Sequence, residues 1–157
     1  MSSFDIAHFK ETVGHFATGV AIVTAATTDG PAGFTCQTFG SLSLEPIMVS
    51  FAAGRGGCSW PRVHAVGRLG INVMADDQET IARVFATSGA EKFLDVEWLP
   101  GPSGSPLLGG ALAHFEGRLV SVVTHGDHDL AVVAIDFAVA HPGRPLLYYR
   151  GGFNGLA

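Results

Sequence analysis

Two long β-rich segments near the C-terminal end constrain the fold of this chain more than any other feature. Ala111–Thr124 and Leu130–Ala140 are rich in apolar residues, many of them valine, and the polar segment His125–Asp129 separates them. Two such segments joined by a short, glycine-containing turn are typical of a β-hairpin. The sequence therefore predicts a long antiparallel hairpin with a polar tip.

Shorter apolar segments bounded by turn residues predict further strands. They are Val20–Ala26, Ala32–Cys36, Phe39–Leu44, Ile47–Ala53, Leu69–Met74 and Pro145–Arg150, with a tight turn at Thr28–Pro31 between the first two. Pro100–Gly110 consists almost entirely of Gly, Pro, Ser and Leu, which predicts an irregular surface loop.

Three short helices complete the expected elements. The first spans Asp5–Phe16, with Asp5 as its N-cap and an apolar stripe of Ile6, Phe9, Val13 and Phe16. The second begins with Ser59 as its N-cap. The third opens at Asp76, which has capping-box spacing to Glu79, and ends at Ser88-Gly89.

This set of elements, about seven strands and three short helices, lacks the regular strand–helix alternation of a doubly wound parallel sheet. The sequence thus predicts a mainly β (α+β) fold, an antiparallel barrel with a few short peripheral helices. No repeat, linker or change in composition divides the chain, so residues 1–157 are expected to form a single domain.

Composition excludes several functional classes. Apolar residues make up 47% of the chain and charged residues 15%, which excludes a disordered chain and suggests that a subunit interface covers part of the surface. The formal charge is −5 without any cluster of Lys or Arg, which argues against nucleic-acid binding. The sequence shows neither a signal peptide nor an apolar stretch typical of a membrane span, so we expect a cytoplasmic protein.

Common catalytic motifs do not occur in the sequence. It contains neither the Gly-x-Ser-x-Gly elbow of hydrolases nor the Gly-x-Gly-x-x-Gly of dinucleotide-binding folds. His125 and His128, which flank Gly126-Asp127, could contribute to a metal site, but their spacing fits a solvated hairpin tip equally well. No metal site is predicted.

The segment Gly33–Ser43 is the densest in potential ligand-binding groups, since it places hydroxyls, an amide and two glycines between predicted strands. Such groups suit a planar heteroaromatic ring or a phosphate. They also satisfy their own backbone in many loops, so a purely structural role stays open. Arg55 with the helix start at Ser59 allows the same two interpretations, a phosphate site or a turn that binds nothing.

Several motifs occur in a characteristic order along the chain. They are Phe16–Thr24, Gly33–Thr35, Phe39–Pro46, Asn72–Val73, Ala90–Phe93, Gly104–Leu108, Gly126–His128 and Pro145–Gly152. From Phe9 to Leu156 the chain thereby resembles the flavin reductase family, small reductases that supply reduced flavin to two-component monooxygenases. The resemblance implies a split β-barrel of Greek-key type that binds FMN or FAD, usually as a homodimer with the flavin near the interface.

The resemblance also implies which residues contact the cofactors. Thr35, Cys36, Gln37 and Thr38 would line the isoalloxazine edge, and Ser41, Leu42 and Ser43 would lie by the ribityl chain or phosphate. Ala52, Ala53, Gly54, Arg55 and Ser59 would form the phosphate cradle. Lys92 and Phe93 would lie beside the flavin, with Phe85 and Ala86 near its tail. Gly126 and His128 would meet the nicotinamide, with His128 as the catalytic residue, and Tyr149 and Arg150 would approach from the C-terminal side.

The expected function is hydride transfer from NADH or NADPH to FMN or FAD, followed by release of reduced flavin to a separate oxygenase. This chemistry needs no protein nucleophile, because the cofactors carry the reactive atoms. Two alternatives stay open: a non-catalytic flavin-binding or storage protein, and an enzyme with fixed flavin that acts on its own small substrate. The choices between FMN and FAD and between NADH and NADPH also stay open.

Overall fold

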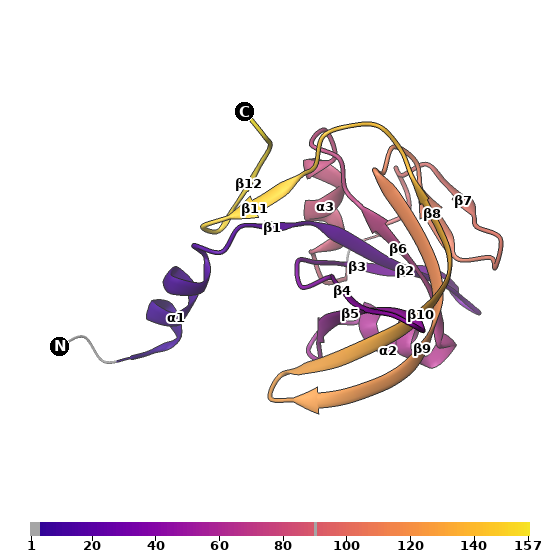
Figure 1. Ribbon diagram of the computed structural model, residues 1–157, viewed down its shortest axis with the longest axis horizontal. Helices are drawn as coiled ribbons and strands as arrows, with labels where there is room; N and C mark the ends of the chain where they lie inside the picture. Colours follow the sequence, from indigo (N-terminus) through magenta and orange to yellow (C-terminus); the bar gives the residue numbers. More distant parts are fainter. Residues whose placement is uncertain (1–3, 90) are drawn as a thin grey trace.

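The computed structural model describes residues 4–89 and 91–157, and its main element is a curved antiparallel sheet (Figure 1). Seven strands follow the order β3-β2-β6-β9-β10-β5-β4. Their bounds are β2 Ala21–Thr27, β3 Gly30–Cys36, β4 Gly40–Leu44, β5 Ile47–Gly54, β6 Arg68–Val73, β9 Ala113–His125 and β10 His128–Ala140. Within the described part of the chain no ladder joins the edge strands β3 and β4. The predicted mainly β, antiparallel fold is confirmed.

The predicted long hairpin lies at the centre of this sheet. β9 and β10 pair from His125 opposite His128 to Ala113 opposite Ala140. At the tip Gly126 has a φ of 61°, a left-handed conformation that glycine adopts without steric cost. β10 pairs on its other side with β5, so that the polar tip of the hairpin reaches the end of β5.

Two groups of buried side chains hold the helices against the sheet. Phe51, Trp60 and Ile71 belong to the group beneath α2 (Ser59–Val66). Phe85 and Leu108 belong to the group around α3 (Glu79–Phe85). Large aromatic side chains such as these bury roughly 150–250 Å² each, so the start of α2 is fixed relative to the strand ends.

The N-terminus of α2 differs from the sequence prediction, whereas that of α1 (Ile6–Val13) agrees with it. Asp5 caps α1, and its carboxylate accepts a hydrogen bond from the His8 N–H at 2.8 Å. The N-cap of α2 is Cys58 rather than Ser59, and no side chain caps this helix. The Ser59 hydroxyl instead accepts a hydrogen bond from Lys92 at 3.1 Å.

The third helix is shorter than predicted. The prediction of a capping box between Asp76 and Glu79 is wrong, because the N-cap is Gln78. Its side-chain amide accepts a hydrogen bond from the Ala75 N–H and donates one to the Gly109 carbonyl. The helix ends at Phe85 rather than at Ser88-Gly89. The Lys92 ammonium donates to the Phe85 carbonyl at 3.0 Å and so satisfies one of the last carbonyls of the helix.

The prediction of an irregular surface loop at Pro100–Gly110 is only partly right, because an exposed turn at Pro102–Gly104 is flanked by two short strands. The segment contributes to a two-stranded hairpin of β7 (Trp98–Pro100) and β8 (Pro106–Leu108). Ser105 and Leu108 are buried, at 2% and 0% exposure. Tertiary contacts therefore hold a segment that has few strand-forming residues of its own.

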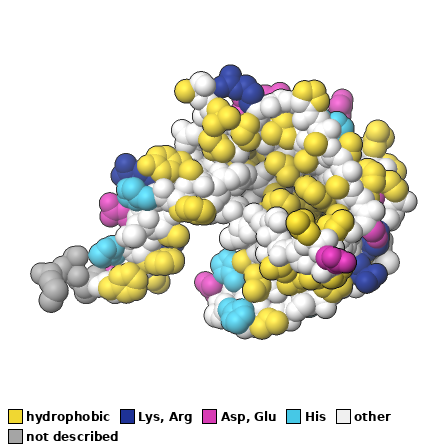
Figure 2. Space-filling view, in the orientation of Figure 1, with side chains coloured by type: hydrophobic (Ala, Val, Ile, Leu, Met, Phe, Trp, Pro, Cys, Tyr) yellow, Lys and Arg dark blue, Asp and Glu magenta, His cyan; other side chains and the backbone are white. Residues whose placement is uncertain are grey.

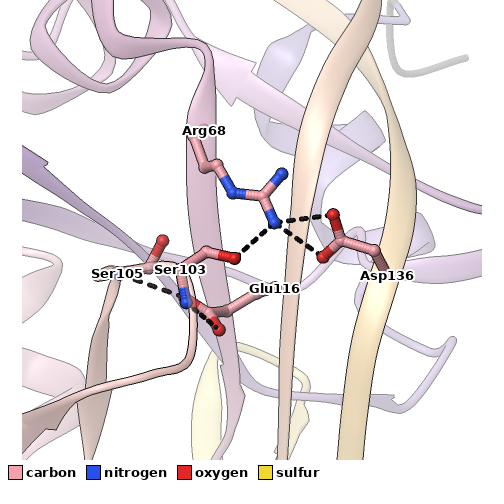
Figure 3. Close-up of polar contacts among 5 residues, drawn as sticks. All are labelled: Arg68, Ser103, Ser105, Glu116 and Asp136. Atoms are coloured by element: carbon pink, nitrogen blue, oxygen red, sulfur yellow. Dashed lines mark hydrogen bonds and ion pairs between the residues drawn. The ribbon is translucent and has the colours of Figure 1, made fainter.

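A buried carboxylate anchors this hairpin (Figure 3). Glu116 on β9 is fully buried and accepts hydrogen bonds from the backbone N–H groups of Ser103, at 3.1 Å, and Ser105, at 3.0 Å. Next to it, Arg68 donates to the Ser103 hydroxyl and to the Asp136 carboxylate, both at 2.6 Å. These contacts fix the loop to β6, β9 and β10.

A separate small sheet carries the N-terminal helix away from the main sheet (Figure 1). It consists of β1 (Thr18–Gly19), β11 (Leu147–Tyr149) and β12 (Gly152–Asn154). No residue of α1 is buried, and its apolar stripe stays at least half exposed. None of the helices in residues 4–89 and 91–157 is long and apolar enough to cross a membrane.

Candidate functional site

The tip of the β9–β10 hairpin meets the end of β5. In the sheet register His128 lies opposite Gly54, and the Arg55 N–H donates to the Asp127 carbonyl at 3.0 Å. A Cβ atom on Gly54 would lie 3.8 Å from His128 Nε2. The structure thus brings Ala52–Arg55 and Gly126–Asp129, two segments far apart in the sequence, into one group, called here the tip–cradle cluster.

The His128 ring is half exposed and held by its neighbour. Its Nδ1 lies 2.8 Å from an Asp127 carboxylate oxygen, and its side chain is 51% exposed. The hydrogen bond from His128, together with its positive charge, lowers the pKa of the Asp127 carboxyl. This contact fixes Nδ1 and leaves Nε2, which lies toward Gly54, as the ring nitrogen that can meet a ligand.

Asp129 lies on the inner side of the same cluster. Its carboxylate accepts hydrogen bonds from Trp60 Nε1 at 2.8 Å and from the Thr124 hydroxyl at 2.7 Å, and it lies 3.7 Å from Arg55 Nε. These hydrogen bonds lower the pKa of the Asp129 carboxyl, with a smaller effect of the Arg55 charge. Asp129 falls in the polar segment that the sequence predicts as the hairpin tip, so its composition does not mark it as a site residue. Alternation along the strand from His128 is the signal that places its side chain inward.

The segment between β5 and α2 offers donors suited to a phosphate. Arg55 has a side chain that is 54% exposed. Added Cβ atoms on Gly56 and Gly57 would meet nothing within 4 Å, so their backbone is open to close approach. The first N–H groups of α2 have no side-chain cap, and such groups bind anions well. The donor set fits the phosphate of a flavin.

Lys92 joins three elements beside this segment. Its ammonium donates to the carbonyls of Gly33 and Phe85, both at 3.0 Å, and to the Ser59 hydroxyl at 3.1 Å. Burial lowers the pKa of Lys92. Phe93 packs on Phe85 with ring centroids 4.9 Å apart. An open pocket of about 520 Å³ borders Gly33, Ser59, Lys92 and Phe93; Ala90 of the same motif lies outside the described residues.

Hydroxyls in the segment Gly33–Ser43 bind the protein itself at two positions. Thr35 Oγ1 donates to the Ala82 carbonyl at 2.7 Å, and Thr38 Oγ1 accepts from the Ala52 N–H at 2.8 Å. Cys36 lies in the core, where burial raises the pKa of its thiol to about 12. Thr35, Cys36 and Thr38 therefore have a structural role in the fold. Gln37, in contrast, is exposed.

The remaining predicted residues lie at other places. Ser41, Leu42 and Ser43 belong to the edge strand β4, where Leu42 is 52% exposed. Ala86 is the C-cap of α3. Tyr149 and Arg150 lie by the small sheet, where the Arg150 N–H donates to the Gly14 carbonyl at 2.9 Å. Arg150 thus lies by Gly14, the C-cap of α1.

A larger cavity of about 890 Å³ lies between α1 and the main sheet. Its walls come from α1, β1, the start of β2 and the loop after β3, and they include Val13, Phe16, Gln37, Thr38 and Tyr148. In the space-filling view a deep notch separates the helix from the rest of the molecule, with hydrophobic side chains along the helix (Figure 2). The cavity thus connects the unburied helix with Gln37 and Thr38.

Comparisons with known proteins agree on one family. Residues 13–157 match the flavin reductase like domain. Reductase subunit HsaB of a flavin-dependent monooxygenase from Rhodococcus jostii (strain RHA1) is 37% identical over 155 residues, covering 98% of this chain and 80% of that protein. The FMN reductase (NADH) SmoA of Agrobacterium fabrum (strain C58 / ATCC 33970) is 33% identical over 146 residues, covering 93% and 83%.

A solved structure gives the same result. The Streptomyces globisporus C-1027 NADH:FAD oxidoreductase SgcE6, in complex with NAD and FAD fragments, has a TM-score of 0.91 and 32% identity. The match covers 98% of this chain and 93% of that one. As its motifs predict, the chain belongs to the flavin reductase-like family.

Proposed function

We propose that this chain is the reductase component of a two-component flavin-dependent monooxygenase system. It is an NAD(P)H-dependent flavin reductase, an oxidoreductase that uses flavin together with a nicotinamide nucleotide. The relative from Rhodococcus jostii is a reductase subunit of this kind, which supports a separate oxygenase as partner. The observation that carries the proposal is the tip–cradle cluster, which joins a phosphate-binding donor set to His128.

Bound flavin supplies the hydride-accepting chemistry, and the protein binds and orients the two cofactors. In the proposed assignment Arg55, the N–H groups of Gly56 and Gly57 and the start of α2 bind the flavin phosphate. Thr38 holds the loop after β3 against β5. The backbone beside Gln37 is thereby fixed in position to meet the edge of the isoalloxazine ring. His128, held at Nδ1 by Asp127, presents Nε2 toward the nicotinamide.

The decisive experiment measures NADH and NADPH oxidation under anaerobic conditions with increasing FMN or FAD. Bleaching of free flavin well beyond one equivalent per subunit is expected, because a reductase component releases its product. Bleaching limited to the bound equivalent would instead support an enzyme with fixed flavin. Flavin binding without any reduction by either nucleotide would support the storage alternative and contradict the proposal.

We also propose that the active form is a homodimer, in which the apolar stripe of α1 packs on a second copy. Phe9 and Val13 are each about half exposed, and Ile6 is 75% exposed. A helix of eight residues is only marginally stable by itself in water, so α1 needs a partner surface. The notch beside the helix offers room for one (Figure 2).

Replacing Phe9 by glutamate is expected to shift the protein from dimer toward monomer by at least tenfold in Kd, because a charge would enter the interface. Light scattering after size-exclusion chromatography, over a dilution series, measures this shift. His8→Glu, which adds the same charge about 100° around α1 from Phe9 and off the apolar stripe, is the matched control and should leave the Kd unchanged. A wild-type protein that is monomeric at micromolar concentration would rule out the dimer.

A cytoplasmic location is proposed as well. Its support is the need for NAD(P)H and the state of the two cysteines, Cys36 and Cys58, which are both free thiols. Free thiols are typical of the reducing cytosol.

A further inference from the structure

Asp129 places a negative charge next to the cation of the proposed phosphate cradle. Its side chain is only 12% exposed, whereas the Arg55 side chain is 54% exposed. The carboxylate oxygen that accepts from Thr124 is the one that lies 3.7 Å from Arg55 Nε. The geometry therefore presents Arg55 to solvent with a buried counter-charge behind it.

Other charges near the cradle do not replace that of Arg55. The Lys92 ammonium is already bound to two carbonyls and to Ser59. His64 stacks on Trp60, with ring centroids 5.2 Å apart. The exposed Asp127 carboxylate of the same cluster is paired with His128 Nδ1 at 2.8 Å. Among the described residues, the carboxylate that faces Arg55 is therefore that of Asp129, 3.7 Å away.

We propose that Asp129 sets the affinity of the cradle for the flavin phosphate, by offsetting the charge of Arg55 so that flavin binds weakly enough to exchange. The inference rests on the proposed function, in which reduced flavin must leave the protein. A carboxylate close to a phosphate site raises the energy of the bound dianion by Coulomb repulsion, and a buried charge is screened by salt less than an exposed one. Asp129 is then an affinity-setting residue, because its charge offsets that of Arg55.

Asp129→Asn changes the charge while it can keep the hydrogen bonds. The amide oxygen can accept from Trp60 Nε1, and the amide nitrogen can donate to Thr124 Oγ1, which is an acceptor as well as a donor. The Kd of FMN, measured by fluorescence titration of the full-length protein, is expected to fall about threefold to tenfold. The Kd of riboflavin, which has no phosphate, should stay unchanged. If Asp129 had a purely structural role, its replacement would not tighten the binding of FMN while leaving that of riboflavin unchanged.

Asp136→Asn is the matched control. It removes the same charge from another Asp–Arg pair on β10, seven residues along the strand and thus roughly 23 Å away, and should leave the Kd of FMN unchanged. An unchanged or higher Kd of FMN in Asp129→Asn, or an equal gain for riboflavin or in Asp136→Asn, would overturn the inference.

The same titrations separate this inference from the proposed function. If Arg55→Gln binds FMN as tightly as the wild type, then the assignment of the cradle is wrong, and the role of Asp129 is wrong with it. If the wild type binds FMN but neither NADH nor NADPH reduces it, the reductase proposal fails, while the binding data still decide the role of Asp129.

Discussion

Replacing His128 by alanine is expected to lower kcat/KM for NADH by about 100-fold, the lower end of the loss typical of a removed acid–base or charge-stabilising group. The Kd of FMN should change by less than about twofold, because the proposed phosphate donors belong to Arg55 and α2. The loss of rate is expected because Asp127 holds Nδ1 of His128, which leaves Nε2, beside Gly54, to meet the nicotinamide. Stopped-flow reduction of FMN under anaerobic conditions measures the rate, and fluorescence titration measures the Kd.

His125→Ala is the matched control for this experiment. His125 is the other histidine of the tip and lies opposite His128 in the hairpin register. It should leave both the rate and the Kd close to those of the wild type. A rate that is unchanged in His128→Ala would remove His128 from the mechanism, and an equal loss in both variants would indicate a general effect on the tip.

Replacing Glu116 by glutamine is expected to lower the free energy of unfolding by about 1–3 kcal/mol. In the wild type both carboxylate oxygens accept from backbone N–H groups of the loop at Ser103 and Ser105. Glutamine replaces one of these acceptors with an NH₂ group, which leaves a buried donor facing another donor. Urea unfolding at fixed protein concentration measures the change, because a dimer makes stability depend on concentration.

Glu45→Gln is the comparison variant for Glu116. Glu45 is exposed in the turn between β4 and β5, and surface substitutions of this kind usually change stability by about 0.5 kcal/mol or less. Equal losses in the two variants would contradict the anchoring role of Glu116.

Local sequence patterns predict the strands of this protein well. The alternation of apolar residues, the turn at Thr28–Pro31 and the glycine at the tip of the β9–β10 hairpin each act within a few residues of the chain. Asp5 caps α1 for the same reason, since its partner is the N–H of His8. Predictions fail where a distant residue decides the structure, as Glu116 does for the loop at Ser103 and Lys92 does for the ends of α2 and α3.

In the candidate site, too, local patterns predict some features and distant contacts decide others. The motif order identifies the family, and the sheet register places His128 opposite Gly54. The contact of Asp129 with Trp60 joins residues 69 positions apart, and no local pattern marks it. The hydroxyls of Thr35 and Thr38 illustrate the opposite case, because their composition suits a ligand while their hydrogen bonds go to the protein.

The different environments of the two cysteines make this protein convenient to label. The thiolate is the form of cysteine that attacks thiol reagents, and Cys36 stays protonated at neutral pH because burial raises the pKa of its thiol to about 12. Cys58 is exposed at the start of α2. A maleimide dye would therefore attach at a single native position, one residue before Ser59, at the edge of the proposed cradle.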